Sequence, residues 1–278
     1  MNMAPMNLAS PDCASRPYAV DRFVCLLADT DEAKRLHYQL RYKVFCEETK
    51  FENPDAFPEN AEFDRYDRHA EHFIVWDRQK QRCAGAMRLV DAGATKLPCE
   101  EIADKSLDGL DTHRLGAVEF SRLCILNEYR RTVHSTTYGP YRPEGQPHAL
   151  ERPVIFQQED NDVFLRLLRA SLEWRPAVRY CYFIVTAALA RVLARFGIPL
   201  TRVGEQVEHR GVRIPFRYDV IEALEGMQQT LSGFAAMVKN SAPYIAYSEF
   251  VDGDFMTHTF SPAFPPPRFA GGTYRLSA

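Results

Sequence analysis

The stretch VRYCYFIVT (178–186) constrains the fold more than any other segment of this chain. It is continuously apolar and rich in β-forming residues, which predicts a central strand buried on both faces. The segments on either side of it, 161–174 and 187–197, carry apolar residues at helical spacing. A strand that is buried on both faces needs a covering layer on each side, and these helices can supply it. The sequence therefore predicts an α/β fold.

Other segments predict further elements of the same sheet. Strands are expected at 22–29, 71–78, 83–92 and 116–126, and the second and third of these form a hairpin. Asp29 predicts the start of a helix over 31–48 by its capping position. The segment 198–220 predicts two strands that turn at Arg210–Gly211. This order describes one mixed sheet flanked by helices.

One domain over 19–238 accommodates all of these elements. The polar tail 1–18 is expected to be flexible, and 132–160 is expected to be a loop insertion rich in Tyr, Pro and Gly. The segment 239–278 is a Pro/Gly-rich C-terminal extension, and its composition argues against packed structure.

Composition and charge narrow the class of protein. The chain is 46% hydrophobic and 26% charged, which is ordinary for a folded domain, and its net charge of −3 argues against a nucleic-acid partner. The longest nearly uninterrupted apolar run, 180–190, is about half of the ~20 residues that span a bilayer. The N-terminus lacks the features of an export signal, and none of the seven cysteines forms a Cys-x-x-Cys pair. We therefore expect a cytoplasmic protein with reduced thiols.

The segment AEFDRYD (61–67) is the most informative for chemistry, because it brings three carboxylates close together beside a strand. If that strand begins early, Glu62 and Asp64 share one of its faces, and Asp67 follows. Three arginines in otherwise apolar patterns are their candidate partners: Arg41, Arg88 and Arg122. An unpaired guanidinium would be costly in such surroundings. The acids and arginines form either a structural ion-pair network or the floor of a substrate site.

The segment VEFSRL (118–123) adds a second feature. Glu119 and Arg122 are three residues apart, so a regular strand would point them to opposite faces. A β-bulge would bring them to the same face and would also free backbone N–H groups to contact a substrate carbonyl.

Two other kinds of site find little support. His69 and His72 have no evident third ligand, and their spacing on an extended segment points them to opposite sides, so no metal site is expected. Cys46 and Cys124 have no recognisable histidine partner, and a buried cysteine is common on packing grounds alone. A nucleophilic cysteine is therefore disfavoured.

Five motifs in order resemble the N-acyl amino acid synthase and autoinducer synthase (acyl-homoserine-lactone synthase) branch of the GNAT acyltransferases: LRYKVFCEE (40–48), EFDRYDRHAEHFIV (62–75), GAMRLV (85–90), LPCEEI (97–102) and VEFSRL (118–123). The later stretch 188–220 looks still more like the acyltransferases associated with bacterial PEP-CTERM/exosortase systems. The resemblance spans about 30–225. It implies a mixed, centrally split β-sheet flanked by helices, that is, an α-β-α sandwich.

The resemblance also assigns individual residues. The positions that match the family's motifs are Arg41 and Phe45 on the first helix, Glu62, Asp64 and Asp67 in its E-x-D-x-x-D, Arg88 in its hairpin, and Glu119, Ser121 and Arg122 in its E-x-S-R. Phe51 stands nearest to where autoinducer synthases have a tryptophan by the S-adenosylmethionine pocket, and Glu47 and Glu48 stand where they often have a basic residue. These departures favour an amino-acid acceptor over S-adenosylmethionine.

The acyl donor implied is acyl carrier protein. The Gly-rich turn with which an acetyl-CoA-dependent GNAT binds pyrophosphate is missing between Leu126 and Asn161. Residues 114–217 hold sixteen arginines, no lysine and ten acids, which gives a net charge of about +6 to which an acidic carrier protein could dock. Ordinary surface charge is the alternative interpretation of these arginines. No tightly bound cofactor is implied, since the phosphopantetheine thioester of the carrier, or acyl-CoA, is a co-substrate.

The implied reaction transfers a fatty acyl group, in our hypothesis a long one, from the thioester to the α-amine of an amino acid. Glu62 or Glu119 would take the proton through water, and Arg88 or Arg122 would hold the acceptor carboxylate. Backbone amides around Phe120–Arg122 would stabilise the oxyanion. The acyl chain is expected between 183–186 and the strands of 200–220. The lipid product would also allow a peripheral membrane contact.

Three alternatives to this reaction remain open. The first is a GNAT enzyme that uses acyl-CoA, and the second is a signal synthase like the acyl-homoserine-lactone synthases. The third is a module that binds acyl chains without catalysis. The acceptor, the chain length and the oligomeric state are also left open.

Overall fold

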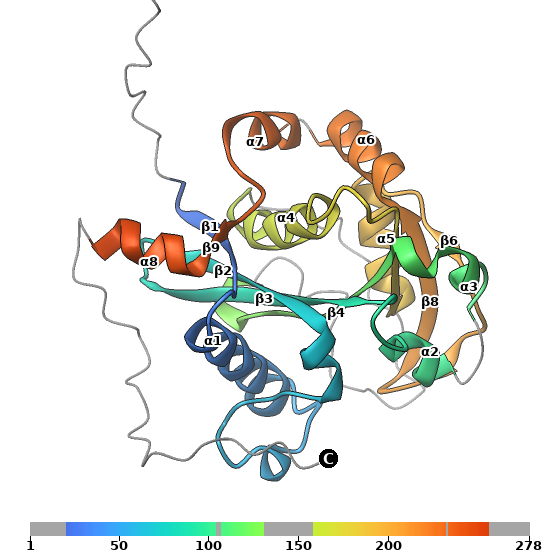
Figure 1. Ribbon diagram of the computed structural model, residues 1–278, viewed down its shortest axis with the longest axis horizontal. Helices are drawn as coiled ribbons and strands as arrows, with labels where there is room; N and C mark the ends of the chain where they lie inside the picture. Colours follow the sequence, from blue (N-terminus) through green and yellow to red (C-terminus); the bar gives the residue numbers. More distant parts are fainter. Residues whose placement is uncertain (1–20, 104–106, 131–157, 232, 256–278) are drawn as a thin grey trace, which may run out of the picture.

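The computed structural model describes residues 21–103, 107–130, 158–231 and 233–255. These residues form a nine-stranded mixed sheet in the order β6-β8-β5-β4-β3-β2-β1-β9, with β7 paired to β8 (Figure 1). The strands are β1 Phe23–Leu27, β2 Ala70–Asp77, β3 Arg82–Asp91, β4 Ala117–Ile125, β5 Tyr180–Val185, β6 Thr201–Arg202, β7 Val207–Glu208, β8 Val212–Asp219 and β9 Ile245–Ala246.

Helices cover both faces of the sheet. The α-helices are α1 Asp31–Tyr42, α2 Pro98–Ala103, α3 Leu110–His113, α4 Gln158–Leu172, α5 Ala187–Arg195, α6 Val220–Thr230, α7 Phe234–Asn240 and α8 Tyr247–Phe255. A π-helical turn, η1 Lys43–Glu48, continues α1, and the short 3-10 turns are η2 Pro54–Ala56, η3 Arg65–His69, η4 Arg114–Gly116 and η5 Asn127–Tyr129. Figure 1 shows α1 on one face of β2, β3 and β4 and α4 on the other. The expected α-β-α sandwich is confirmed.

Local sequence explains where the main elements begin. The side chain of Thr30 caps α1 by accepting a hydrogen bond of 3.1 Å from the amide of Ala33, so the cap lies one residue after the predicted Asp29. Thr186 caps α5 in the same way, at 3.2 Å from the amide of Leu189. Arg210 and Gly211 both have positive φ, at 55° and 90°, and they form the predicted turn between β7 and β8.

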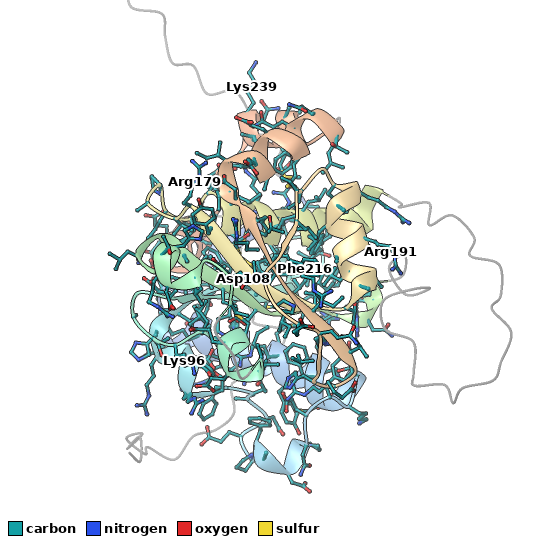
Figure 2. The ribbon with its side chains drawn as sticks, turned by 90° about the vertical axis from the view of Figure 1, so that its right-hand side faces the viewer. Lys96, Asp108, Arg179, Arg191, Phe216 and Lys239 are labelled. Atoms are coloured by element: carbon teal, nitrogen blue, oxygen red, sulfur yellow. The ribbon has the colours of Figure 1, made fainter. Side chains whose placement is uncertain are left out.

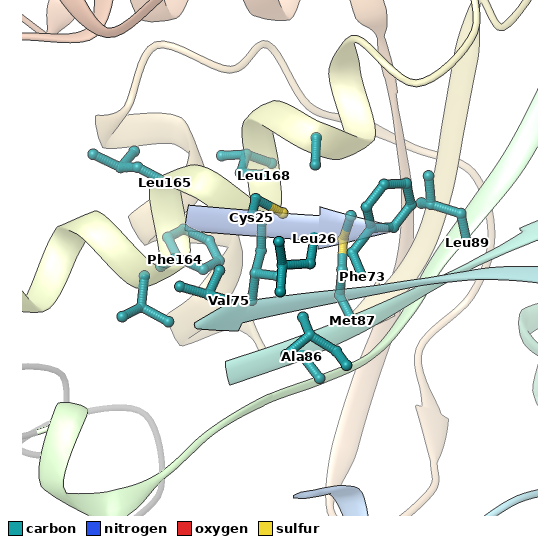
Figure 3. Close-up of a cluster of buried hydrophobic side chains, with 14 of the residues drawn as sticks. Cys25, Leu26, Phe73, Val75, Ala86, Met87, Leu89, Phe164, Leu165 and Leu168 are labelled. Carbon is teal, nitrogen blue, oxygen red and sulfur yellow. The ribbon is translucent and has the colours of Figure 1, made fainter. Parts of the chain in front are cut away.

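The main hydrophobic core packs on both faces of the first three strands, against α4 on one face (Figure 3) and against α1 on the other. It includes Cys25 and Leu26 from β1, Phe73 and Val75 from β2, Ala86, Met87 and Leu89 from β3, and Phe164, Leu165 and Leu168 from α4. Met87 and Leu89 of β3 face α4, whereas Ala86 and Arg88 point to the opposite face, where α1 packs.

The sheet is split in its centre. The parallel strands β4 and β5 pair only over Ala117–Glu119 and Tyr180–Tyr182. Beyond these pairs β5 continues to pair with β8 along its whole length, whereas β4 continues with β3. The two strands therefore diverge after their first three residues. The split follows from β4, whose register shifts against β3.

The C-terminal part of the structure differs from the sequence prediction, which ended the packed domain at 238. Ile245 and Ala246 pair in parallel with β1, and the side chains of Tyr247 and Phe250 are buried against the core. The Pro- and Gly-rich composition that suggested an extension comes mainly from residues after 255, and it masked this short apolar segment. Packing therefore continues to about Phe250.

Two expected segments lie largely outside the described residues. They are the tail 1–18 and the insertion 132–160, except that residues 158–160 already belong to α4. Among the described helices, none combines the length and the hydropathy that a bilayer-spanning segment requires.

Candidate active site

The three carboxylates after the first helix are oriented by a short turn. Asp64 is the N-cap of η3, where its side chain accepts from the amide of Tyr66 at 2.9 Å, and Asp67 accepts from the amide of Asp64 at 2.7 Å. The amide of Glu62 donates to the carbonyl of Tyr38 on α1 at 3.0 Å. The strand expected to begin near Glu62 starts only at Ala70, so a capping box, and not strand alternation, sets the directions of these carboxylates.

Arg41 is the most deeply buried member of the site. Its guanidinium donates to Asp67 Oδ1 at 2.7 Å and to Glu62, and it has no exposed surface. Burial would lower its pKa, but Asp67 and Glu62 together raise it above the usual value. Arg41 therefore stays charged inside the protein and anchors both acids.

Arg88 and Arg122 complete a charge cluster, which comprises Arg41, Glu62, Asp64, Asp67, Arg88 and Arg122. Arg88 contacts Asp64 Oδ1 at 2.5 Å and Asp67 Oδ1 at 3.0 Å, and its Nε donates to Ser121 Oγ at 3.2 Å. Arg122 contacts Glu62 Oε1 at 3.1 Å and Asp64 Oδ2 at 3.0 Å. The predicted meeting of acids from one segment with arginines from three elements is therefore present in the structure.

Asp67 lies at the centre of the charge cluster. Burial alone would raise its pKa, but Arg41, a hydrogen bond of 3.0 Å from His72 Nε2, and Arg88 hold the pKa well below its usual range. His72 is buried in turn, which lowers the pKa of its imidazole in spite of Asp67. A neutral histidine that donates to a charged aspartate fixes the direction of the carboxylate.

The predicted β-bulge lies in β4. Ser121 is opposite Arg88 and Cys124 is opposite Ala86, so Arg122 and Leu123 share a single partner residue, Met87. Arg122 has a φ of 50°, in the left-handed region, as expected for such an irregularity. The bulge brings Arg122 to the same face as Ser121, where both contact the charge cluster.

Glu119 stands apart from the charge cluster on the same strand. Its Oε2 accepts from the amide of Cys99 at 2.8 Å, at the start of α2, and among the described residues it forms no ion pair with the arginines of the cluster. Burial raises the pKa of Glu119 to about 7, although hydrogen bonds from Cys99 and the charges of Arg88 and Arg122 oppose the rise. Glu119 is thus a carboxyl poised to exchange a proton near neutral pH.

The two aromatic site residues have different surroundings. Phe45 lies beneath Arg122, with 6.0 Å between the guanidinium carbon and the ring centroid. Phe120 points away from the charge cluster into an apolar cleft on the α4 side of the split. The cleft is lined by Phe120, Leu123, Phe164, Leu168, Phe183, Val185, Leu189, Leu193 and Tyr218.

The apolar cleft lies partly where the acyl chain was expected. We expected the chain between 183–186 and the strands of 200–220, and Phe183, Val185 and Tyr218 from these segments line the cleft, whose other lining residues come from β4, α4 and α5. The cleft is shallow and partly open to solvent, and it extends from β5 towards β4.

Sequence reasoning missed several residues near the site. Tyr66 lies under Arg88, with the ring centroid 5.7 Å from the guanidinium carbon, and Glu52 contacts both Arg122 and Arg210. The position of Tyr66 inside the acidic motif could have suggested its role. Nothing local marks Glu52 and Arg210, because they are far apart in the sequence.

Metal and thiol chemistry can be assessed for the described residues. Within them, no group of three or more His, Cys, Asp or Glu side chains is arranged to hold a metal ion. The six cysteines of these ranges are buried and free. Burial raises the pKa of Cys46 to about 11 and that of Cys124 to about 12, so neither thiol is prepared to act as a nucleophile.

Comparison with known proteins agrees with this geometry. Residues 40–137 match the family described as Acetyltransferase (GNAT) domain, and this segment contains every member of the charge cluster. No curated protein sequence matches the chain. The matched segment is thus similar to a GNAT acetyltransferase domain, and the solved structures that resemble the chain share its fold.

Solved structures share the fold at low sequence identity. TofI, in a ternary complex with an inhibitor and MTA, is 16% identical with a TM-score of 0.51, over 74% of this chain and 96% of that chain. BjaI, a CoA-dependent acyl-homoserine lactone synthase with SAM and isopentyl-CoA, is 16% identical with a TM-score of 0.50, over 80% and 92%. FeeM, an N-acyl amino acid synthase from uncultured soil microbes, is 13% identical over 75% and 97%, and its TM-score of 0.46 is too low to support a conclusion.

Proposed function

We propose that the protein transfers a fatty acyl group from an acyl carrier protein thioester to the α-amine of an amino acid. One observation carries this proposal: a charged site and an apolar cleft meet at the bulge of β4. Ser121 and Arg122 face the charge cluster, whereas Phe120 and Leu123 line the cleft. An enzyme that joins a charged acceptor to a fatty acyl chain needs these two environments on either side of the reacting carbonyl.

The chemistry requires no covalent enzyme intermediate. The neutral amine attacks the thioester carbonyl, a C–N bond forms, the C–S bond breaks, and the carrier leaves as a thiol. The amine loses one proton to a base, and the departing sulfur takes up one proton. Catalysis then consists of placing the amine, accepting its proton and stabilising the oxyanion.

Glu119 is the stronger of the two candidate bases. Glu62 forms ion pairs with both Arg41 and Arg122, whereas Glu119 forms none with the cluster and its pKa is raised to about 7. A base near neutral pKa gives the best compromise between the fraction ionised and the basicity. Because Glu119 is buried, we propose that a water carries the proton to it.

Ser121 and the backbone amides of the bulge are proposed to serve the oxyanion. Ser121 Oγ accepts a hydrogen bond from Arg88, which leaves its hydroxyl hydrogen available to a bound ligand. Among the three cluster arginines only Arg122 reaches the surface, with its side chain 23% exposed, so we assign it to the acceptor carboxylate. Arg41, Arg88, Asp64 and Asp67 hold it in position.

Helix α5 supports acyl carrier protein as the donor. Leu189 and Leu193 line the cleft, whereas Arg191 and Arg195 are exposed on the other side of the same helix. Figure 2 shows Arg191 at the outer edge of the molecule, well away from Lys239 on α7. A carrier protein bound to α5 would place its prosthetic group beside the cleft, and its acidic surface would meet these arginines.

The decisive experiment supplies the purified protein with different donors and acceptors. Palmitoyl carrier protein or palmitoyl-CoA is incubated with a mixture of the twenty amino acids or with S-adenosylmethionine, and products are identified by mass spectrometry. We expect N-palmitoyl amino acids from the carrier protein. A product only from palmitoyl-CoA would change the donor, and a homoserine lactone product would replace this function with that of a signal synthase. Binding of the acyl chain without any product would favour a non-catalytic module.

A charge reversal on α5 tests whether acyl carrier protein docks there. Arg191→Glu should raise the KM for the acyl carrier protein several-fold at low salt, and the difference should shrink as salt screens the charges. The matched control is Lys239→Glu, the same charge reversal at another exposed site, and it should leave this KM unchanged. Equal effects from the two reversals would mean that docking does not depend on α5.

A further inference from the structure

The hairpin formed by β7 and β8 reaches across to the segment that follows the first helix. Arg210, at its tip, contacts Glu52 Oε1 at 2.5 Å, and Arg122 lies 3.9 Å from the same oxygen. The hairpin belongs to the half of the sheet beyond the split, whereas Glu52 and Arg122 belong to the other half. One carboxylate oxygen therefore lies between two guanidinium groups that come from opposite sides of the split.

The hairpin tip is held in this position by its own backbone. Val207 pairs with Arg213 and Glu208 with Val212, and the amide of Gly211 donates to Glu208 Oε1 at 3.1 Å. The guanidinium of Arg213 donates to the carbonyl of Arg210 at 3.1 Å. These contacts present Arg210 to Glu52 from a rigid turn, which is the arrangement expected of a residue that recognises a ligand.

The region around the tip is rich in positive charge. Burial lowers the pKa of His209, and Arg210, Arg213 and Arg122 lower it further. Three guanidinium groups therefore act on one imidazole, which stays neutral, and Glu52 is the carboxylate that faces two of them. Such a site can bind another anion in place of Glu52.

Glu52 is the most replaceable carboxylate around Arg122. Glu62 and Asp64 contact Arg122 at 3.1 Å and 3.0 Å, and both are also bound by a second, fully buried arginine of the charge cluster. Glu52 is 3.9 Å from Arg122, and among the described residues its one other ion pair is with Arg210, whose side chain is 36% exposed. If the carboxylate of a ligand displaced the Glu52 side chain, the buried charge cluster would stay intact.

We propose that Arg122 and Arg210 together bind the carboxylate of the acceptor, and that the carboxylate of Glu52 occupies this site until the acceptor arrives. This inference rests on the proposed function. An α-carboxylate has two oxygens and can bridge both guanidinium groups, which a simple amine cannot do. Arg210 thereby becomes a specificity residue for amino acids over amines, although it lies outside the matched GNAT segment.

Two substitutions with opposite expected effects test the proposal. Arg210→Gln should raise the acceptor KM about 10- to 100-fold, because a charge-assisted contact is lost, with kcat and donor KM nearly unchanged. Glu52→Gln should lower the acceptor KM about 3- to 10-fold, because a competing charge is removed. The matched control is Arg202→Gln on β6, an exposed arginine with a neighbouring acid, and it should change neither constant.

The outcomes separate this proposal from the proposed function. An unchanged acceptor KM in Arg210→Gln, or a raised one in Glu52→Gln, would overturn the assignment while acyl transfer itself stands. Calorimetric titration of the same variants with the best acceptor, without any donor, gives a second measurement that needs no turnover. If the unmodified protein binds no amino acid in that titration, the acceptor site is refuted, and if it binds one but never acylates it, only the proposed reaction fails.

Discussion

The two faces of β4 differ in chemistry although they belong to the same few residues. On one face Ser121 contacts Arg88, and Arg122 contacts three carboxylates, whereas on the other face Phe120 and Leu123 line an apolar cleft. Regular alternation would separate Ser121 from Arg122, but the bulge places them together. A single irregularity in one strand thus brings a site for a charged substrate next to a site for an acyl chain.

The charged face itself contains two kinds of carboxylate. Those of Glu62, Asp64 and Asp67 are bound by guanidinium groups, whereas Glu119 is buried beside an amide and a thiol. The first kind is suited to holding a geometry, and the second to exchanging a proton.

The largest effect is expected for Glu119→Gln. If Glu119 is the base, kcat should fall by about 10²–10⁴, because the amide cannot take the proton. Glu128→Gln is the matched control. Glu128 lies just after β4 in the chain, but it forms surface ion pairs with Lys80 and Arg82. Steady-state rates of acyl transfer at pH 8 measure the difference, and an unchanged kcat would remove Glu119 from this role.

The raised pKa of Glu119 also predicts an unusual stability profile. Its pKa rises from 4.5 to about 7 on folding, so between these values the folded state binds the extra proton and loses stability as pH increases. At about 1.4 kcal/mol for each pKa unit, the loss approaches roughly 3 kcal/mol. Glu119→Gln should be at least as stable as the unmodified protein at pH 8 in urea unfolding, although it is far less active.

In the unmodified protein kcat/KM should rise as pH passes about 7.

The next effect in size concerns the carboxylates that hold geometry. Arg41→Met removes a fully buried partner of Glu62 and Asp67, and it should lower the free energy of unfolding by about 3–5 kcal/mol. Lys43→Met, two residues further on, removes only an exposed pair with Glu47 and should cost less than about 0.5 kcal/mol. Urea unfolding at pH 7 compares the two.

Acid should weaken the contrast between these variants. The pKa of Asp67 is lowered on folding, so its stabilising contribution is present at neutral pH and is lost as pH falls below the ordinary value for aspartate. The difference between the unmodified protein and Arg41→Met should therefore shrink in acid. Similar costs for Arg41→Met and Lys43→Met at pH 7 would contradict the structural role of the charge cluster.

The features of this molecule that depend on residue spacing within one segment could be predicted from its sequence. The strand at 178–186, the hairpin of β2 and β3, and the bulge near Arg122 all follow from spacing within one segment. The pairing of Arg41, Arg88 and Arg122 with the acids of 62–67 could also be expected, because buried guanidinium groups need partners.

Contacts between distant segments could not be predicted in this way. Glu52 and Arg210 are 158 positions apart, and neither stands in an apolar pattern that would demand a partner. The distinction between Glu62 and Glu119 depends on burial against α2, which no spacing within β4 reveals. The cleft lies between β4 and β5 because β8 occupies the other edge of β5, and strand order emerges only in three dimensions.

The smallest of the three effects is expected on the apolar face. Leu189 is half-buried and lines the cleft, so Leu189→Trp should fill part of it and shift the preference towards shorter acyl chains. Lost contacts with the terminal methylenes are worth about 1–3 kcal/mol, or roughly 10- to 200-fold in kcat/KM for the longest chains. The acceptor KM should not change, because the charged face of β4 is untouched.

The control for this substitution comes from the same helix. Ala194 is exposed and does not line the cleft, so Ala194→Trp adds an indole of the same size to α5 without entering the cleft. Only Leu189→Trp should change the relative rates of transfer from carrier proteins that hold C8, C12 and C16 chains. If both variants slow transfer equally for all chain lengths, the acyl chain binds elsewhere. The assignment of the acyl chain and the acceptor to opposite faces of β4 would then be wrong.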